Sequence, residues 1–416
     1  MRIGRVVLAG AVLAVAGLSA CSSSSPKPGA ASTSAQPCAW PWVGGVQNYN
    51  LAFPDSAAYY WAQPIAAGPS TSITVFGTYP SARYFSLSVY TPSGDPFSQS
   101  GVTSSLPDYR IDPSAGSSNP WQHRAAPGGH FEVAIRSDVA PGHANVLPLP
   151  PGTSALHPGY LVYRVYLPAG GTGSHLTPPA ITLREGSANH TLPVCRTRTP
   201  APAPEKAPGG QGATGQSGVP PPDAFYKPNF QNGVANADTA YVWAYVVRPP
   251  ASDVLVVSAK APTYAPGASP SPWPAAGQDM RYWSMCIGVG TSTLPTVVNT
   301  LPGGETDYGC RADDATKLDA AGNYTYVIGS EAQQAAISKI PGATFLPFSS
   351  TQTTRLYLLL LRNLLVNPSF SHSVQNVTQA SDAPAAAAAM GPYYPKVSRC
   401  ALSTLTTGGV SACLSQ

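Results

Sequence analysis

The segment Ala82–Tyr90 (ARYFSLSVY) has the period of two that is typical of a β-strand, and the turn Thr91–Gly94 closes it. Its phenylalanine, leucine and valine fall on one face, and its tyrosines and serines fall mainly on the other. A near copy, Met280–Ile287 (MRYWSMCI), follows at an offset of 198 residues, counted from arginine to arginine (281 − 83). We therefore expect a β-strand with one buried face that occurs twice in the chain.

Further short blocks recur in the same order in the two halves of the chain. They are Tyr59–Trp61 with Tyr241–Trp243, Asp108–Tyr109 with Asp307–Tyr308, Phe131–Ile135 with Tyr324–Ile328, Leu147–Pro148 with Leu346–Pro347, and Arg164–Leu167 with Arg355–Leu358. One such match arises by chance, but a whole ordered series indicates a duplicated domain. Short alternating segments between proline and glycine turns are typical of sandwiches and jelly rolls. The sequence thus predicts an all-β protein with two tandem, duplicated β-sandwich (jelly-roll-like) domains.

Few short helices are expected beside the strands. The segment Glu331–Lys339 is predicted to be helical, because Ser330 can cap its first turn and Pro341 ends it. A second helix is expected to begin at Asn367–Pro368 and to reach Val374.

The first residues resemble a bacterial lipoprotein signal. Arg2 and Arg5 precede the apolar stretch Val6–Gly17, and Leu18–Cys21 (LSAC) then places small residues before a cysteine. This resemblance implies that residues 1–20 are a signal peptide and that Cys21 carries fatty-acyl chains such as palmitate. An ordinary signal peptide with a chance cysteine is the alternative. We expect a protein that is lipid-anchored at the extracytoplasmic face of the cell membrane.

Composition marks the domain limits. Residues 21–37 are rich in serine, alanine and proline and are predicted to be a disordered tether. The first sandwich is expected over residues 38–195, and the second, with a C-terminal tail, over residues 223–416. Residues 196–222 are rich in proline and glycine and are predicted to be the linker between them.

Charge and motifs exclude several classes of function. Only 10% of the 416 residues are charged, and the net charge of +4 is not gathered in a cluster, so nucleic-acid binding is not expected. The chain has no phosphate-binding glycine loop and no Cys-x-x-Cys pair, so we expect no cofactor and no metal site.

Six cysteines remain besides Cys21, an even number that indicates disulfides in an exported chain. Six cysteines allow 15 connectivities. Of these, we expect the pairs Cys38–Cys195, Cys286–Cys310 and Cys400–Cys413.

Each expected disulfide has its own argument. The first would tie together the ends of the first domain, and the third would close the C-terminal tail. The block matches give Cys286 the counterpart Ser88 and Cys310 the counterpart Ile111. The second pair is therefore an addition to the second half, and its two cysteines are expected to bond across neighbouring strands.

A family resemblance supports the fold. Four blocks carry it: Arg83–Tyr90, Phe131–Ile135, Asn145–Pro150 (NVLPLP) and Tyr163–Pro168. They are similar to a bacterial domain of unknown function with a jelly-roll-like fold, in which a tryptophan stands at the place of Val146 and an alanine at that of Leu149. The chain as a whole resembles uncharacterised secreted lipoproteins of actinobacteria. The resemblance implies a fold but no activity.

Two functions are compatible with these patterns. The first is a non-catalytic binding or structural module of the cell envelope, with a glycan, lipid or protein ligand. Its candidate binding residues are Arg83, Tyr84, Arg281 and Tyr282, since an arginine beside a tyrosine suits acidic or sugar groups. In the structural alternative, which we favour, both arginines bond carbonyls or a carboxylate such as Asp108 or Asp307.

The second function is a secreted cell-wall or glycan hydrolase that uses paired carboxylates. The candidate acids are Asp112 with Glu132 in the first domain, and Glu305, Asp307 and Asp314 in the second. Aspartates near turns also make local hydrogen bonds, so this pattern is weak evidence for catalysis, and a non-enzymatic role is favoured.

The lipoprotein signal predicts the chemistry of the mature N-terminus. The N-terminal peptide of the protein from its native membrane should begin at Cys21 and carry the added mass of fatty-acyl chains. Mass spectrometry of that peptide measures this directly, and a Cys21→Ala variant should leave the membrane fraction. An unmodified peptide that begins at another residue would contradict the prediction.

Overall fold

A computed structural model describes residues 37–66, 68, 70–171, 173–200, 221–229, 234–291 and 293–414. The predicted signal peptide, Cys21 with almost all of the tether, and most of the predicted linker lie outside these residues. Residues 38–416 belong to one compact unit.

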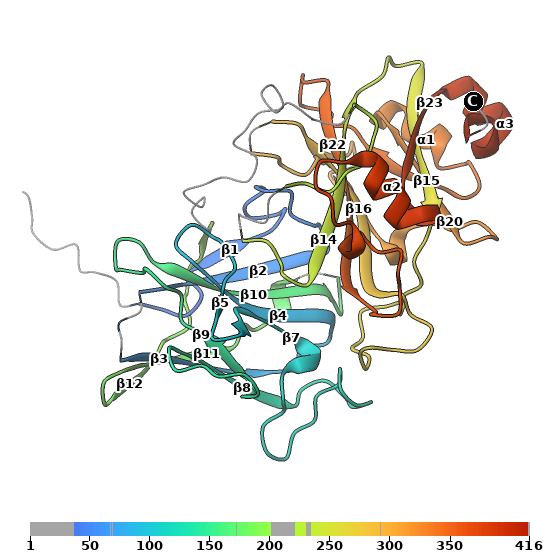
Figure 1. Ribbon diagram of the computed structural model, residues 1–416. Coiled ribbons are helices and arrows are strands. Elements are labelled where there is room, and N and C mark those ends of the chain that lie inside the picture. Colours follow the sequence, from blue (N-terminus) through green and yellow to red (C-terminus); the bar gives the residue numbers. More distant parts are fainter. Residues whose placement is uncertain are drawn as a thin grey trace, which may run out of the picture. The chain divides into compact units, whose positions relative to one another are not determined.

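Residues 38–200 form two facing sheets, which we call the N-terminal sandwich (Figure 1). The strand order is β13-β1-β2-β10-β4-β7 in one sheet and β12-β11-β3-β8-β9 in the other. The strands are β1 (Trp42–Gly44), β2 (Ala58–Ile65), β3 (Thr71–Thr78), β4 (Ala82–Tyr90), β7 (Ser105–Pro107), β8 (His130–Arg136), β9 (Val146–Pro148), β10 (Gly159–Pro168), β11 (Ala180–Glu185), β12 (Ala188–Thr191) and β13 (Thr199–Pro200). A small hairpin of β5 (Ser98–Gln99) and β6 (Val102–Thr103) precedes β7.

Residues 221–414 form the C-terminal sandwich, with the strand orders β14-β22-β16-β19 and β21-β20-β15-β23. Its strands are β14 (Thr239–Val247), β15 (Asp253–Lys260), β16 (Met280–Val289), β19 (Cys310–Ala312), β20 (Asn323–Gly329), β21 (Ala343–Pro347), β22 (Leu356–Val366) and β23 (Lys396–Ala401). The hairpin of β17 (Val298–Thr300) and β18 (Thr306–Tyr308) precedes β19. The protein is therefore all-β, as the sequence predicts.

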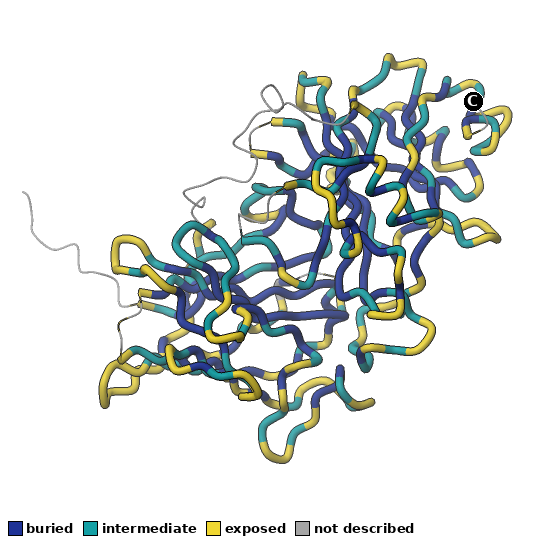
Figure 2. Tube along the Cα trace, in the orientation of Figure 1, coloured by how far each residue is buried: buried dark blue, intermediate teal, exposed yellow. Residues whose placement is uncertain are grey.

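Both cores are built from the faces that the alternating pattern marks as apolar. Phe85 and Leu87 of β4 pack with Val75 and Val133 of the facing sheet. In the second core, residues of β16 such as Met285 pack in the same way with β15 and β20. Figure 2 draws these strands as buried along most of their length.

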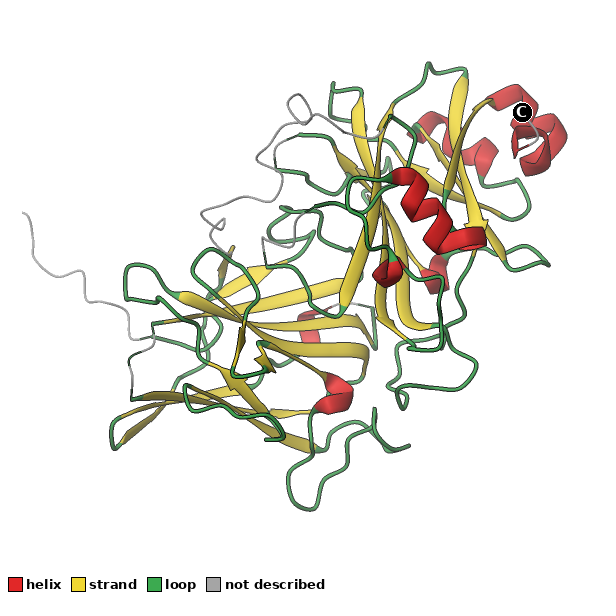
Figure 3. Ribbon diagram, in the orientation of Figure 1, coloured by secondary structure: helices red, strands yellow, loops and turns green. Residues whose placement is uncertain are grey.

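The α-helices lie in the C-terminal half of the chain, and the helical segments of the N-terminal sandwich are short 3₁₀ turns (Figure 3). The helix α1 (Glu331–Ile337) confirms the helix predicted over Glu331–Lys339, although it ends two residues earlier, and Ser330 caps it in a capping box with Gln333. The helix predicted from Asn367 to Val374 is wrong, because this segment is mostly turns and only a single 3₁₀ turn begins at Val374. Two further helices were not predicted, α2 (Ala383–Met390) and α3 (Leu402–Leu414).

Three details differ from the predicted layout. The pairs β8–β9 and β20–β21 are parallel, whereas a jelly roll is antiparallel throughout. The end of the chain is more than a tail, since β23 pairs along β15 and the disulfide Cys400–Cys413 holds α3 beside it. The first sheet also extends to Pro200, past the predicted limit at residue 195, because β13 pairs with β1.

The two sandwiches have matching strand registers. Ser86 of β4 lies opposite Arg164 of β10, and Ser284 of β16 lies opposite Arg362 of β22. The counterpart of Arg164 is therefore Arg362, and the predicted counterpart Arg355 is wrong, because it precedes β22 by one residue.

A second correction concerns the aspartates. Asp108 and Asp313 each begin a short 3₁₀ turn after the edge strand of their sheet. Asp108 accepts the backbone N–H of Phe85 at 3.0 Å, and Asp313 accepts that of Trp283 at 3.1 Å. Asp108 thus matches Asp313, and the predicted counterpart Asp307 is wrong.

The structure joins the cysteines in the three expected pairs. Cys286 and Cys310 are directly opposed residues of β16 and β19. At the matching place in the N-terminal sandwich, Ser88 opposes Ser105, and their hydroxyl oxygens lie 2.9 Å apart. The counterpart of Cys310 is therefore Ser105, and the predicted counterpart Ile111 is wrong.

The sandwiches meet through the polar faces of β4 and β16, where reciprocal ion pairs cross from one sandwich to the other. Arg83 donates to Asp313 at 2.5 Å and also pairs with Asp314. Arg281 donates to Asp108 at 3.2 Å. All four main partners are fully buried. This reciprocal pattern is that of a two-fold symmetric dimer interface, formed here within one chain.

Breaking one crossed pair should destabilise the protein strongly. Asp108→Ala leaves the buried guanidinium of Arg281 uncompensated, so we expect the free energy of unfolding to fall by about 3–5 kcal/mol. Asp223→Ala is the control, since its pair with Arg399 is partly exposed and should cost less than about 1 kcal/mol. Urea unfolding of both variants measures the difference, and equal losses would contradict the structural role of the crossed pair.

Candidate functional site

A cavity of about 250 Å³ lies between the two sandwiches. Both sandwiches contribute walls: β1, β2 and β10 from the first, and β14 and β22 from the second. Its aromatic lining residues are Trp42, Tyr49, Phe53, Tyr60, Tyr160, Tyr166, Tyr241 and Trp243. Its charged lining residues are Arg164, Lys227 and Arg362, and the described lining includes no aspartate, glutamate or histidine. The cavity therefore suits a ligand that has an apolar body and a negative charge.

Arg164 and Arg362, which occupy matching positions, are the buried cations of this cavity. Their exposed fractions are 2% and 3%. The guanidinium of Arg164 lies 5.7 Å from the ring centre of Tyr60, and that of Arg362 lies 5.3 Å from the ring centre of Tyr241. These tyrosines also match, since each lies opposite its arginine on the neighbouring strand.

The surroundings of the two arginines also match at the backbone. Arg164 donates to the carbonyl of Val234 at 2.6 Å, and Arg362 donates to the carbonyl of Phe53 at 3.3 Å. Both acceptor residues have a left-handed backbone, with φ of 65° at Val234 and 59° at Phe53. Such a conformation is rare for large or β-branched residues, and its occurrence beside both arginines marks the cavity wall as a strained place.

The surroundings of the two arginines differ in one respect, the presence of a carboxylate partner. Arg362 pairs with the buried carboxylate of Asp55, which also accepts the hydroxyls of Tyr282 at 2.8 Å and Ser284 at 2.7 Å. The residue in the matching place near Arg164 is Asn236. The local turns establish this correspondence, because Asp55 accepts the N–H of the residue two positions later at 2.9 Å and Asn236 does the same at 3.1 Å.

Arg164 consequently has only neutral acceptors among the described residues. Its Nη2 donates to the hydroxyl of Tyr90 at 2.8 Å and to the carbonyl noted above, and its Nη1 approaches Ser88 at 3.4 Å. Burial raises the pKa of Tyr60 and of Tyr90, so these phenols stay neutral at physiological pH. The charge of Arg164 is thus not balanced by a neighbouring anion in direct contact.

The candidate binding residues lie elsewhere. Arg83, Tyr84, Arg281 and Tyr282 are all fully buried between the sandwiches, and none of them lines the cavity. Both arginines bond carboxylates, as the structural alternative has it, but each uses a carboxylate of the opposite sandwich. Their burial leaves no surface on which a ligand could contact them.

The candidate catalytic acids do not meet at the cavity. Asp112 and Glu132 have neighbouring backbones, because the side chain of Asn145 donates to both of their carbonyls at 2.8 Å. Both acids are exposed on the N-terminal sandwich.

The acids of the second domain have other roles. Asp307 pairs with Arg311 at 2.8 Å, Asp314 pairs with Arg83, and Glu305 is exposed. The described residues thus give the hydrolase alternative no acid pair in a cleft.

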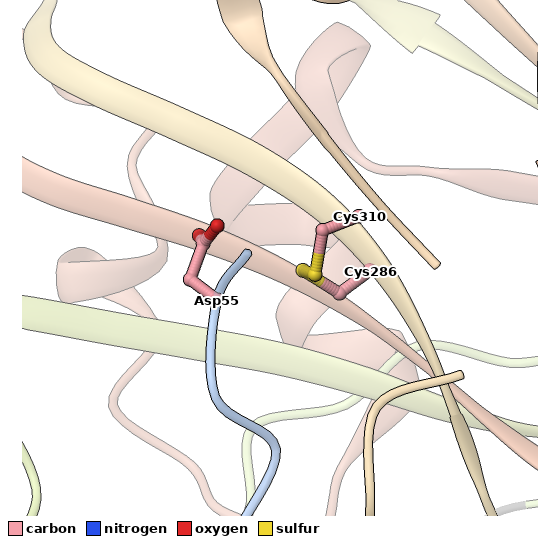
Figure 4. A group of neighbouring side chains, drawn as sticks. All are labelled: Asp55, Cys286 and Cys310. Atoms are coloured by element: carbon pink, nitrogen blue, oxygen red, sulfur yellow. A yellow bond between two sulfur atoms is a disulfide. The ribbon is translucent and has the colours of Figure 1, made fainter. Parts of the chain in front are cut away.

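Asp55, Cys286 and Cys310 form a buried group with the spacing of metal ligands (Figure 4). The two sulfurs are joined in a disulfide and the carboxylate is paired with Arg362. A metal needs thiolates and a free carboxylate, so this group does not fit a metal ion.

Among the described residues, no helix has the length and apolar character needed to cross a membrane.

Comparisons with known proteins support the fold. No family model matches the chain, and no curated protein matches it. A solved structure of an uncharacterised protein from Burkholderia cenocepacia is similar, with a TM-score of 0.50 and 12% identity over 89% of this chain and 85% of that one. The VPA0106 protein from Vibrio parahaemolyticus matches with a TM-score of 0.38 and 11% identity over 86% and 90%. At this identity the likeness to the Burkholderia protein shows the fold alone.

The matched positions of Cys286–Cys310 and Ser88–Ser105 predict the result of an exchange. Cys286→Ser with Cys310→Ser should reproduce the hydroxyl pair of the N-terminal sandwich and leave the fold intact. The loss of a cross-link over 24 residues should lower the free energy of unfolding by about 3 kcal/mol.

The reciprocal variant, Ser88→Cys with Ser105→Cys, should form a new disulfide. Urea unfolding with and without reductant, together with peptide mapping, measures both outcomes. A loss of cooperative unfolding in the double serine variant would contradict the match.

Proposed function

We propose that this protein is a lipid-anchored, extracytoplasmic binding protein of the cell envelope, which holds a small ligand between two β-sandwiches related by duplication. The lipoprotein signal at Cys21 supports the anchor, and the matching strand registers support the duplication. The observation that carries the binding function is the inter-sandwich cavity, whose aromatic walls and three cations come from both sandwiches.

The chemistry of the lining favours binding over hydrolysis. Acid–base catalysis of glycoside cleavage uses two carboxyl groups that flank the scissile bond. The described lining of the cavity has none, and its cations would favour an anion in the ground state. The function therefore rests on recognition, with aromatic side chains that provide contact area and arginines that provide charge.

A ligand screen on the full-length chain in detergent tests this function. Small aromatic and aliphatic molecules, neutral and charged, are compared by the rise that each produces in the melting temperature. Ala237→Trp should fill the cavity, because Ala237 is an exposed lining residue, and it should abolish each rise. Ala188→Trp on the exposed strand β12 is the matched control and should keep every rise. Binding that survives Ala237→Trp would place the ligand outside the cavity and overturn this assignment.

A further inference from the structure

Arg164 is a buried cation that lacks a carboxylate partner among the described residues. Buried charges in proteins are almost always paired, because a charge removed from water without compensation is costly. Of its five N–H donors, three have acceptors among the described residues, and these acceptors are neutral. Arg164 is also one of the residues that line the cavity, which distinguishes it from the buried Arg83 and Arg281.

Arg362 shows what would complete such a site. Its guanidinium contacts a backbone carbonyl and a tyrosine ring that match those beside Arg164. The two arginines also lie opposite matching serines of the neighbouring strand. Arg362 differs by the carboxylate of Asp55, which neutralises its charge. An anion that contacts the guanidinium from the cavity would do the same for Arg164.

Asn236 keeps that place uncharged while it preserves the local structure. Its amide oxygen accepts the N–H of Asp238 at 3.1 Å and lies 3.3 Å from the hydroxyl of Tyr84. Ser86, whose counterpart Ser284 donates to Asp55, has a buried hydroxyl with no hydrogen-bond partner among the described residues. The carboxylate is thus missing from a polar pocket that is otherwise kept.

Asp238 is the nearby carboxyl group, and it does not replace the missing partner. Its Oδ2 accepts the hydroxyl of Tyr84 at 2.7 Å, and it forms no ion pair with Arg164. Burial raises the pKa of Asp238, while its hydrogen bond with Tyr84 and the charge of Arg164 act in the opposite direction, so Asp238 acts on Arg164 at a distance and not through a direct contact.

We propose, building on the binding function above, that Arg164 receives the carboxylate of a small monoanionic ligand whose apolar or aromatic body lies against Trp42, Tyr160 and Trp243. A guanidinium binds a planar carboxylate through parallel N–H donors, which fixes the orientation of the ligand. One uncompensated arginine matches one negative charge. A ligand of this class also fits a cavity of about 250 Å³.

The test compares acids with their neutral amides. Benzoate is measured beside benzamide, and hexanoate beside hexanamide, by isothermal titration calorimetry on the full-length protein. Each acid should bind at least ~10-fold more tightly than its amide, because the charge-assisted contact is made by the acid alone. Equal affinity of acid and amide would overturn the role of Arg164 and leave the binding function standing. Absence of binding by all four probes would overturn both.

Asn236→Asp tests whether the missing carboxylate beside Arg164 causes the preference for acids, and it keeps the arginine in place. The new carboxylate should pair with Arg164 and accept the free hydroxyl of Ser86, so the preference for the acid should fall to about 1-fold while amide binding stays. The melting temperature of the unliganded protein should rise as well.

A second variant guards against repulsion between the new carboxylate and Asp238. Asn236→Asp with Asp238→Ala recreates the sequence pattern of Asp55 and Ala57 in full. Arg184→Gln, on the exposed face of β11, is the charge control and should change neither affinity nor preference. An unchanged acid preference in both Asn236 variants would overturn the proposal.

Discussion

The crossed pairs Arg83–Asp313 and Arg281–Asp108 hold this structure together. Each sandwich buries an arginine and an aspartate that it does not pair with each other, and the opposite sandwich supplies both partners. Charges of this kind are stable in the interior only when the geometry of the pair is satisfied. The crossing therefore fixes how β4 meets β16, and with it the width and the walls of the cavity beside them.

The sequence predicts the inner faces of the strands well and the outer faces poorly. Alternation of Phe85, Leu87 and Val89 with polar residues identifies the side that enters the core. It does not tell whether the opposite side meets water or protein, since tyrosine and serine suit both. The tyrosines of β4 and β16 that suggested a binding surface are instead buried at the interface. Their partners come from residues more than 150 positions away, and no local pattern contains that information.

Register is the other limit. The segment before and within β22 offers two arginines, Arg355 and Arg362, and a leucine-rich run between them fits either alignment. Because both faces of β22 are buried, the strand is apolar on both sides, and a shifted register gives nearly the same hydrophobic pattern. The register therefore follows only from the strand pairing in the structure. The candidate site was missed for the same reason. When Arg164 is aligned with Arg355 instead of Arg362, Asp55 and Asn236 are not recognised as counterparts. The change from a carboxylate to an amide beside the arginine then goes unnoticed.

Two sandwiches with matching strand registers in one chain can differ at a matched position, which the two halves of a symmetric homodimer cannot do. In a homodimer, a change from aspartate to asparagine occurs in both subunits. Both arginines then lose their carboxylate partner, and with it the stabilising ion pair. Here Asp55 forms an ion pair with Arg362, whereas Asn236 leaves Arg164 without a carboxylate partner. The two arginine positions thereby become unequal: Asp55 neutralises the charge of Arg362, while the charge of Arg164 has no carboxylate partner among the described residues, so the two sides of the cavity differ in charge although their strand registers match.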